Sequence, residues 1–215
     1  MPTPLYIEWL GQVDYDEGLS IQEAYVKKVD SGESPETLLL LEHHPIFTIG
    51  RTRDDSSLKK DTVLPHPVRQ TNRGGQATYH GPGQLVGYPI LNLRNRVQDL
   101  HRYLRFLETV LIETLAIDGI DAISRDALTG VWVQERKIAS IGVGVRKWVT
   151  MHGFALNVTN ESLSGFQSII PCGIADVEMT SVEREIKKES SVQEVSRIFA
   201  EKFQACLPEL LPSAK

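Results

Sequence analysis

In the first half of the chain, apolar residues recur at helical spacing in one segment and form short runs in others. The first pattern predicts a helix and the second predicts strands. The apolar stripe at helical spacing predicts one helix. Asp14 or Asp16 would cap its start, and a polar run at residues 31–36 would end it. The stripe consists of Tyr15, Leu19, Val26 and Val29. Apolar runs around this helix predict strands at residues 5–10, 37–41 and 46–49. The second run is continuous, which is typical of a strand buried on both faces.

The second half begins with an apolar strand at residues 85–93 and the clearest amphipathic helix of the chain at residues 97–115. Short connections then join apolar runs at residues 130–133, 137–145 and 148–158, which favours antiparallel strands. Ser191 and Glu194 have capping-box spacing and predict a last helix. Its predicted core-facing residues are Val192, Val195, Ile198 and Phe199. Together these elements predict an α/β (α+β) fold, in which a mixed sheet is flanked by helices.

Length and composition limit the possible classes of protein. With 215 residues, 41% of them hydrophobic, we expect one domain over residues 1–215. No signal-peptide pattern or long apolar run is present, so we expect a cytoplasmic protein that neither enters nor spans a membrane. A net charge of −5 argues against nucleic-acid binding. His43 and His44 are adjacent before Pro45, which indicates strand-end residues, and we expect no metal site.

Residues 73–90 form a stretch with five glycines and two prolines, which is poor material for a packed helix or strand. Gly74 and Gly75 predict one turn, and a second glycine pair at residues 81–83 predicts another. In the extended piece between them, Thr78 and His80 share one face and Tyr79 takes the other. A hairpin that serves topology alone is the alternative. The clustering of Arg73, Thr78, His80 and Gln84 favours a binding site.

A long polar loop at residues 51–67 precedes this stretch, and long loops beside a site are often lids. Basic residues crowd the region and would attract an acidic protein partner. These residues are Arg51, Arg53, Lys59, Lys60, Arg69, Arg73, Arg94 and Arg96.

The two cysteines lie in different contexts. Cys172 is flanked by Pro171 and Gly173, a turn-like context that exposes a thiol, so it is the candidate nucleophile. Cys206 follows Phe203 on the last helix and is expected in the core. A nucleophilic thiol needs a base or cation beside it. His80 and Lys137 are both candidates, and spacing alone does not choose between them.

Four segments carry a family resemblance in the same order: residues 73–88, 137–143 (KIASIGV), 152–158 (HGFALNV) and 171–173 (PCG). The chain resembles the lipoyl(octanoyl) transferases. The resemblance implies the fold of the catalytic domain of biotin and lipoate protein ligases, a Cys172–Lys137 dyad and no cofactor. The substrate-binding residues that we expect are Arg73, Gly74, Gly75, Gln76, Ala77, Thr78, Tyr79, His80, Ser140, Ile141, Gly142, Gly153, Phe154 and Ala155.

The same resemblance implies the reaction. An octanoyl or lipoyl group would pass from acyl carrier protein to Cys172 as a thioester, and then to a lysine of a lipoyl domain. The acceptors would be the lipoyl domains of 2-oxoacid dehydrogenase E2 subunits and the glycine cleavage H protein. Two alternatives remain open: an ATP-dependent lipoate–protein ligase on the same fold, and a non-catalytic acyl-binding protein.

Overall fold

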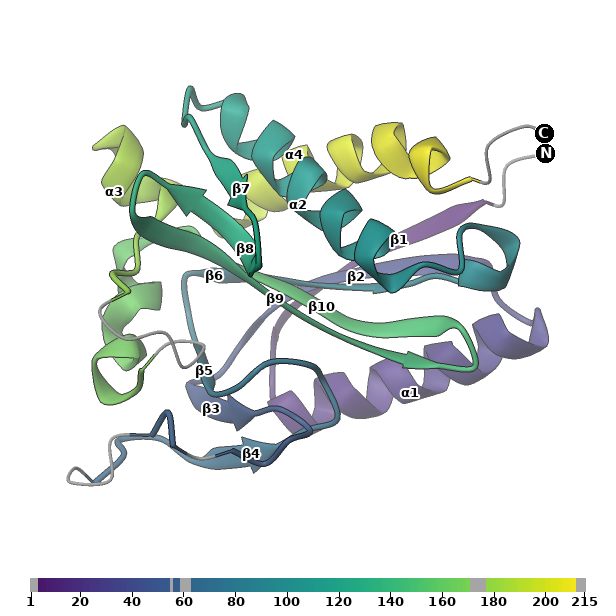
Figure 1. Cartoon of the computed structure of the whole chain (residues 1–215), viewed down its shortest axis with the longest axis horizontal. Coiled ribbons are helices and arrows are strands. Elements are labelled where there is room, and N and C mark those ends of the chain that lie inside the picture. Colours follow the sequence, from purple (N-terminus) through teal and green to yellow (C-terminus); the bar gives the residue numbers. More distant parts are fainter. Residues whose placement is uncertain (1–3, 55, 59–62, 171–176, 212–215) are drawn as a thin grey trace.

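Our computed structural model of the chain describes residues 4–54, 56–58, 63–170 and 177–211. Within these ranges, seven strands form one sheet in the order β1-β2-β6-β10-β9-β8-β7 (Figure 1). The strands are β1 (Leu5–Val13), β2 (Glu36–His43), β6 (Gln84–Ile90), β7 (Ile123–Arg125), β8 (Leu128–Val133), β9 (Arg136–Arg146) and β10 (Val149–Asn157). The pair β1–β2 is parallel and the other pairs are antiparallel. The predicted mixed sheet and the antiparallel β8–β9–β10 order are therefore confirmed.

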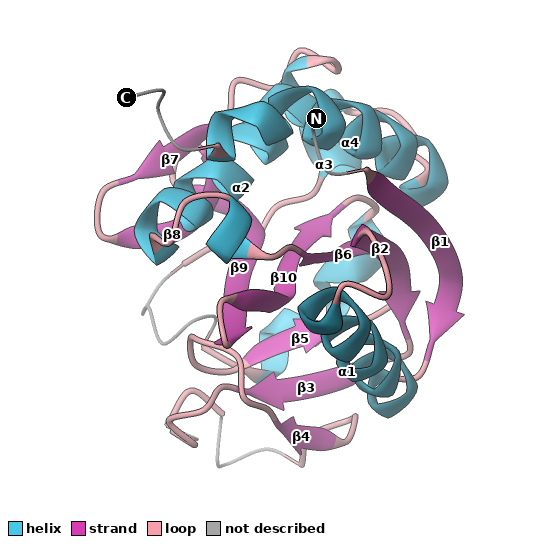
Figure 2. Cartoon of the chain, turned by 90° about the vertical axis from the view of Figure 1, so that its right-hand side faces the viewer, coloured by secondary structure: helices cyan, strands magenta, loops and turns pink. Residues whose placement is uncertain are grey.

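Helices cover both faces of this sheet (Figures 1 and 2). Leu38 and Leu40 of β2 join the core cluster under α2 (Leu100–Ala116) and α4 (Val192–Cys206). Leu39 and Leu41 join the opposite cluster, which includes apolar residues of α1 (Tyr15–Ser31). Because successive residues of a strand point to opposite faces, the continuous leucine run of β2 fills both clusters. None of the helices in the described ranges is long and apolar enough to cross a membrane.

Side-chain caps set where most of the helices begin. The Asp99 carboxylate accepts from two backbone amides, so α2 begins at Leu100 and leaves Val97 outside, contrary to the predicted start. Asp14 occupies the N-cap position of α1 but makes no capping hydrogen bond. The Ser191 hydroxyl accepts from the Glu194 amide at the start of α4, which is the Ser191 half of the predicted capping box.

A second, smaller sheet has the order β4-β3-β5 and lies beside the large one (Figure 1). It consists of β3 (Ile46–Ile49), β4 (Val68–Gln70) and β5 (Thr78–His80). Phe47 of β3 and Tyr79 of β5 pack with Phe166 of the 3-10 segment η2 (Asn160–Ser168). The sequence predicted β3 but not the sheet, nor β7 and α3 (Val182–Ile186). The strand predicted at residues 85–93 ends at Ile90, and Leu93 opens the 3-10 turn η1 (Leu93–Asn95).

Arg96 joins distant parts of the chain. Its guanidinium forms a buried ion pair with Glu36 of β2 and also donates to the carbonyl of Leu207, where the 3-10 segment η4 (Leu207–Leu210) begins. Arg94 instead pairs with Asp30 at the end of α1. The prediction that basic residues crowd around the glycine-rich stretch and would attract an acidic partner is therefore wrong for Arg96, while Lys59 and Lys60 lie outside the described residues. It is wrong for Arg73 too, which is also buried.

Candidate active site

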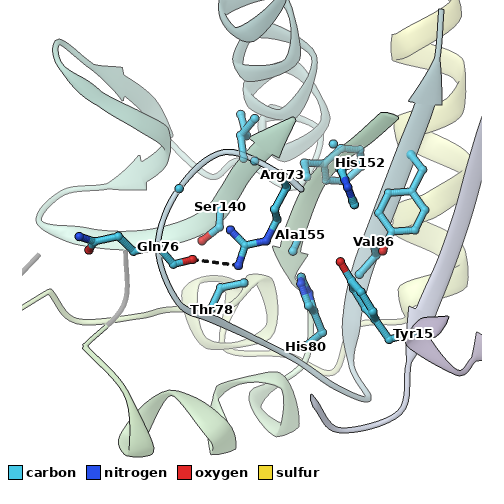
Figure 3. A pocket seen from close by; sticks show the side chains of 15 residues that line it. Tyr15, Arg73, Gln76, Thr78, His80, Val86, Ser140, His152 and Ala155 are labelled. Carbon is cyan, nitrogen blue, oxygen red and sulfur yellow. Dashed lines mark hydrogen bonds between the residues drawn. The ribbon is translucent and has the colours of Figure 1, made fainter. Parts of the chain in front are cut away.

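A pocket lies between the centre of the large sheet and the glycine-rich stretch (Figure 3). Its empty space is about 480 Å³, open solvent at its mouth included. The predicted substrate-binding residues that line it are Arg73, Gly75, Gln76, Thr78, His80, Ser140, Ile141, Gly142, Gly153, Phe154 and Ala155. Four further lining residues were not predicted for the site: Tyr15, Val86, Tyr88 and His152.

Three predicted substrate-binding residues, and also the predicted catalytic Lys137, are not among the described residues that line the pocket. Tyr79 points away from it, as the strand alternation of Thr78, Tyr79 and His80 predicted, and packs in the cluster of the small sheet. Ala77 is fully buried. The Gly74 amide donates to the carbonyl of Val143 across 2.9 Å, which ties the stretch to β9.

Glycines allow backbone to pack directly on backbone around the pocket. A Cβ at Gly142 would lie 2.9 Å from the Gly74 oxygen, and a Cβ at Gly153 would lie 2.2 Å from the Gly87 oxygen. Side chains at these positions would separate β9 from the glycine-rich stretch and β10 from β6. This close approach of backbone to backbone is the reason for glycine at both positions.

The guanidinium of Arg73 lies at the middle of the pocket (Figure 3). It donates to the hydroxyl and carbonyl of Thr48 on β3, at 2.8 and 2.7 Å from Nη2. It also donates to the carbonyls of Gly74 and Gln76, each at 2.9 Å. These bonds wrap the glycine-rich stretch around one buried positive charge.

His80 is buried and its two ring nitrogens are both engaged. Nδ1 donates to Oε1 of Gln84 across 2.8 Å, and Nε2 accepts from the Thr48 hydroxyl across 3.4 Å. Burial, followed by the neighbouring His43 and Arg73, holds the pKa of His80 well below its usual value. A neutral imidazole held in this way is a weak base.

Lys137, near the start of β9, is 2% exposed. Its ammonium donates to the carbonyl of Thr129 across 3.0 Å and lies 5.2 Å from the ring centre of Trp132. Its backbone amide donates to the carbonyl of Glu178 across 2.8 Å, and the Thr180 amide donates to the Lys137 carbonyl across 2.9 Å. A lysine at this position is thus a buried charge attached to residues 178–180, not a solvated strand end.

Cys172, with Pro171 and Gly173, lies outside the described residues. Before it, the amide of Ile170 donates to the carbonyl of Ser57 across 2.7 Å, and Ile169 forms an isolated bridge with Leu58. After it, residues 178–180 pair with Lys137. The described chain on both sides of Cys172 is therefore fixed to the site.

The loop that the sequence predicted as a lid, residues 51–67, contacts Gln76 of the glycine-rich stretch through two of its described residues. The Gln76 carboxamide donates to Asp54 across 2.9 Å and accepts from the Ser57 hydroxyl across 3.1 Å. A lining residue of the pocket thus bonds to both Asp54 and Ser57.

Cys206, as predicted, is buried on α4, where its thiol donates to Glu113 across 3.4 Å. Burial and the Glu113 carboxylate raise the pKa of Cys206 to about 11.

Comparison with known proteins gives the relationship of the chain. The lipoyl protein ligase A/B catalytic domain family matches residues 14–204. The octanoyltransferase of Geotalea uraniireducens is 49% identical over 94% of this chain and 93% of its own length. Further octanoyltransferases are 47 to 49% identical over comparable spans.

Solved structures show the same fold. A lipoate-protein ligase A bound with ATP has a TM-score of 0.78 at 19% identity, over 96% of this chain and 86% of its own. The biotin protein ligase of Aquifex aeolicus with biotin and ATP has a TM-score of 0.61 at 17% identity, over 95% of this chain and 71% of its own. The predicted biotin and lipoate ligase fold is confirmed. By the sequence matches, which cover nearly the full length of both chains, this chain belongs to the octanoyltransferases, within the lipoyl protein ligase A/B catalytic domain family.

Proposed function

We propose that this chain transfers an octanoyl group from a thioester donor to a lysine of an acceptor protein through a thioester on Cys172, as one cytoplasmic domain over residues 1–215. As an octanoyltransferase, it is an acyltransferase that serves protein lipoylation, so it needs an acyl donor and a lipoyl-accepting protein. The observation that carries the proposal is the buried ammonium of Lys137. It lies on the strand that lines the pocket, and its backbone pairs with the residues that follow Cys172.

Two steps account for the transfer. In the first, the thiolate of Cys172 attacks the donor carbonyl, the new C–S bond forms, and the C–S bond of the donor breaks while the Lys137 ammonium gives a proton to the leaving sulfur, so that Lys137 becomes neutral. In the second, the acceptor amine attacks the acyl-enzyme, the amide bond forms, and the Cys172 thiolate leaves while Lys137 takes the proton of the amine. Exchange between thioesters is nearly isoenergetic and amide formation runs downhill, so the reaction needs no ATP.

The pocket suits an apolar acyl chain. Val86, Ile141, Phe154 and Ala155 provide apolar surface from the three central strands of the large sheet. At about 0.8 kcal/mol for each buried methylene, six methylenes would contribute roughly 5 kcal/mol of binding. That is enough to distinguish an octanoyl group from much shorter chains.

For the donor we propose octanoyl-acyl carrier protein, and for the acceptors the lipoyl domains of 2-oxoacid dehydrogenase E2 subunits and the glycine cleavage H protein. Arg51 and Arg53 support an acidic donor, because both are exposed on the loop that Gln76 holds at the pocket. The Arg51 amide donates to the carbonyl of Arg73 across 2.9 Å, so this part of the loop is close to the site.

Intact mass spectrometry tests the proposal. The chain is mixed with octanoyl-acyl carrier protein, and the expected result is one octanoyl adduct that a lipoyl domain then removes. Cys172→Ser is expected to abolish the adduct. Cys206→Ser is the matched control, because the thiol of Cys206 is buried and bonded to Glu113. An adduct that maps to Cys206 would contradict the assignment.

An ATP-dependent lipoate–protein ligase is the second candidate, favoured by the fold that the chain shares with a ligase bound with ATP. Incubation with octanoic acid, ATP and a lipoyl domain decides between the two. Modification under those conditions, with none from octanoyl-acyl carrier protein, would favour the ligase. A non-catalytic acyl-binding protein would form no covalent adduct in either experiment.

A further inference from the structure

The register of strands β9, β10 and β6 defines two ends of the pocket. Lys137 lies near the start of β9, and the neighbouring strands β10 and β6 place Asn157 opposite Gln84 at the same end of the sheet. Tyr88 lies further along β6, level with Gly153 and hence with Gly142 of β9. An acyl chain attached near Lys137 therefore points its methyl end toward Tyr88.

Aromatic rings close this far end. Tyr88 and His152 meet edge to face with ring centres 6.3 Å apart, and Tyr15 enters from the start of α1. All three line the pocket and are at most 5% exposed. Figure 3 shows Tyr15 and His152 on one side of Arg73, and Gln76 and Ser140 on the other. The end away from Lys137 is thus a wall of rings drawn from three elements.

The Tyr88 hydroxyl and Nε2 of His152 are both engaged in hydrogen bonds with other residues. The Tyr88 hydroxyl donates to Nε2 of His43 across 2.6 Å, and Nδ1 of His43 donates to the carbonyl of Val13 across 2.8 Å. Nε2 of His152 donates to the Asn72 carboxamide oxygen across 2.6 Å. An apolar chain tip can therefore meet the ring carbons without leaving these polar atoms unsatisfied.

We propose that the ring of Tyr88 is the end stop of the pocket and sets the longest acyl chain that the enzyme accepts efficiently. The inference rests on the proposed function, because it takes the pocket to hold the acyl chain of the thioester. The Tyr88–His43 hydrogen bond keeps the hydroxyl out of the pocket, and the ring itself blocks a longer chain. Tyr15 covers the same end from α1.

A series of acyl chain lengths tests the inference. Octanoyl-, decanoyl- and dodecanoyl-acyl carrier protein are mixed with each variant, and the rate of acyl-enzyme formation is followed by intact mass. Tyr88→Leu removes the ring and is expected to raise the dodecanoyl-to-octanoyl rate ratio at least tenfold. Tyr88→Phe keeps the ring and is expected to preserve the wild-type order. Tyr103→Leu is the matched control, because Tyr103 is a fully buried tyrosine of α2 outside the pocket.

Each outcome supports or overturns the inference. An unchanged ratio in Tyr88→Leu, or the same shift in Tyr103→Leu, would overturn it while leaving the proposed function intact. Failure of the wild-type chain to form an adduct with any donor would instead overturn the proposed function, and the inference with it. Should Tyr88→Leu not fold, Tyr15→Leu opens the same end from α1 and must shift the ratio in the same direction.

Discussion

The side-chain amide of Asn157 donates a 3.0 Å hydrogen bond to the backbone carbonyl of Thr180. The carboxamide oxygen of the same residue accepts from Gln84 across 2.9 Å, and the amide of Thr180 donates to the Lys137 carbonyl. One buried asparagine at the end of β10 thus connects the glycine-rich stretch to the residues that hold Lys137. Its contacts lead to the first prediction.

Asn157→Leu should cost about 1–3 kcal/mol of unfolding free energy, because one buried N–H of Gln84 and the buried carbonyl of Thr180 lose the hydrogen bonds that Asn157 makes to them. It should also slow acyl-enzyme formation, because the two backbone hydrogen bonds of Lys137 would then hold residues 178–180 without the support of Asn157. Urea unfolding and intact mass measure the two effects. The control is Asn160→Ala, which removes a part-buried hydrogen bond between the exposed Asn160 and Ser181, the next residue of the same segment. Equal losses of acylation rate in both variants would contradict the proposed role.

Lys137→Arg should separate the two half-reactions. Arginine keeps a positive charge near the thiolate, so some acylation should remain, but a guanidinium cannot take up the proton of the attacking amine. We expect the acyl-enzyme to accumulate and to transfer poorly, with the second half-reaction slowed about a hundredfold or more. Single-turnover measurements of each step check this result.

His80→Ala is the matching variant, since His80 is the rival base. Both nitrogens of His80 are engaged, so we expect a loss of stability and weaker binding but no selective loss of the second step. Full transfer by Lys137→Arg together with a selective second-step defect in His80→Ala would assign the base to His80.

Charge reversal of Arg51 and Arg53 to Glu should weaken the use of octanoyl-acyl carrier protein by about tenfold and hardly affect a small octanoyl thioester. The physical reason is electrostatic attraction to an acidic protein, which should fade in 1 M salt as the Debye length falls to about 3 Å. The value of kcat/KM for both donors measures the effect. Lys188 and Arg197, exposed near and on α4, supply the control pair. Equal losses with both donors would mean that Arg51 and Arg53 serve the fold.

Stability should fall as the pH drops below about 6.5. Burial lowers the pKa of both His43 and His152 to about 4, so the unfolded chain takes up protons that the folded chain does not. Each histidine then loses up to about 1.4 kcal/mol of stability per pH unit between pH 6.5 and 4. Urea unfolding at pH 7, 6 and 5 measures the slope.

The variant that checks this slope is His43→Gln, which should reduce the pH dependence. Replacement of the exposed His101 on α2 should leave it unchanged. A slope that His43→Gln does not alter would mean that His43 contributes little to the acid sensitivity.

Local periodicity was sufficient to predict most strands and the three long helices. The leucine run of β2 predicted a strand buried on both faces, and the structure confirms this through two separate core clusters. Alternation in β5 likewise predicted that Tyr79 points away from the face shared by Thr78 and His80. These predictions succeeded because each depends on the side-chain direction within one element.

The far end of the pocket was not predictable in this way. Tyr15 belongs to the apolar stripe of α1, and a stripe does not reveal which distant strand it meets. His152 has a left-handed backbone with φ of 55° inside β10, and its amide donates to Gln22 of α1 instead of to a neighbouring strand. Such residues depend on contacts between remote segments, for which a single sequence carries no local signal.

The contact of Arg96 with Glu36 and Leu207 has a consequence for how the chain is made. Leu207 follows Arg96 by 111 residues, so at roughly 5–20 residues per second the ribosome needs about 6–22 s to add the last partner. During that time the sheet face that α4 later covers is still open, although β1 and β2 have already left the ribosome. Nascent chains of this protein therefore present an apolar surface to chaperones until α4 has been synthesised.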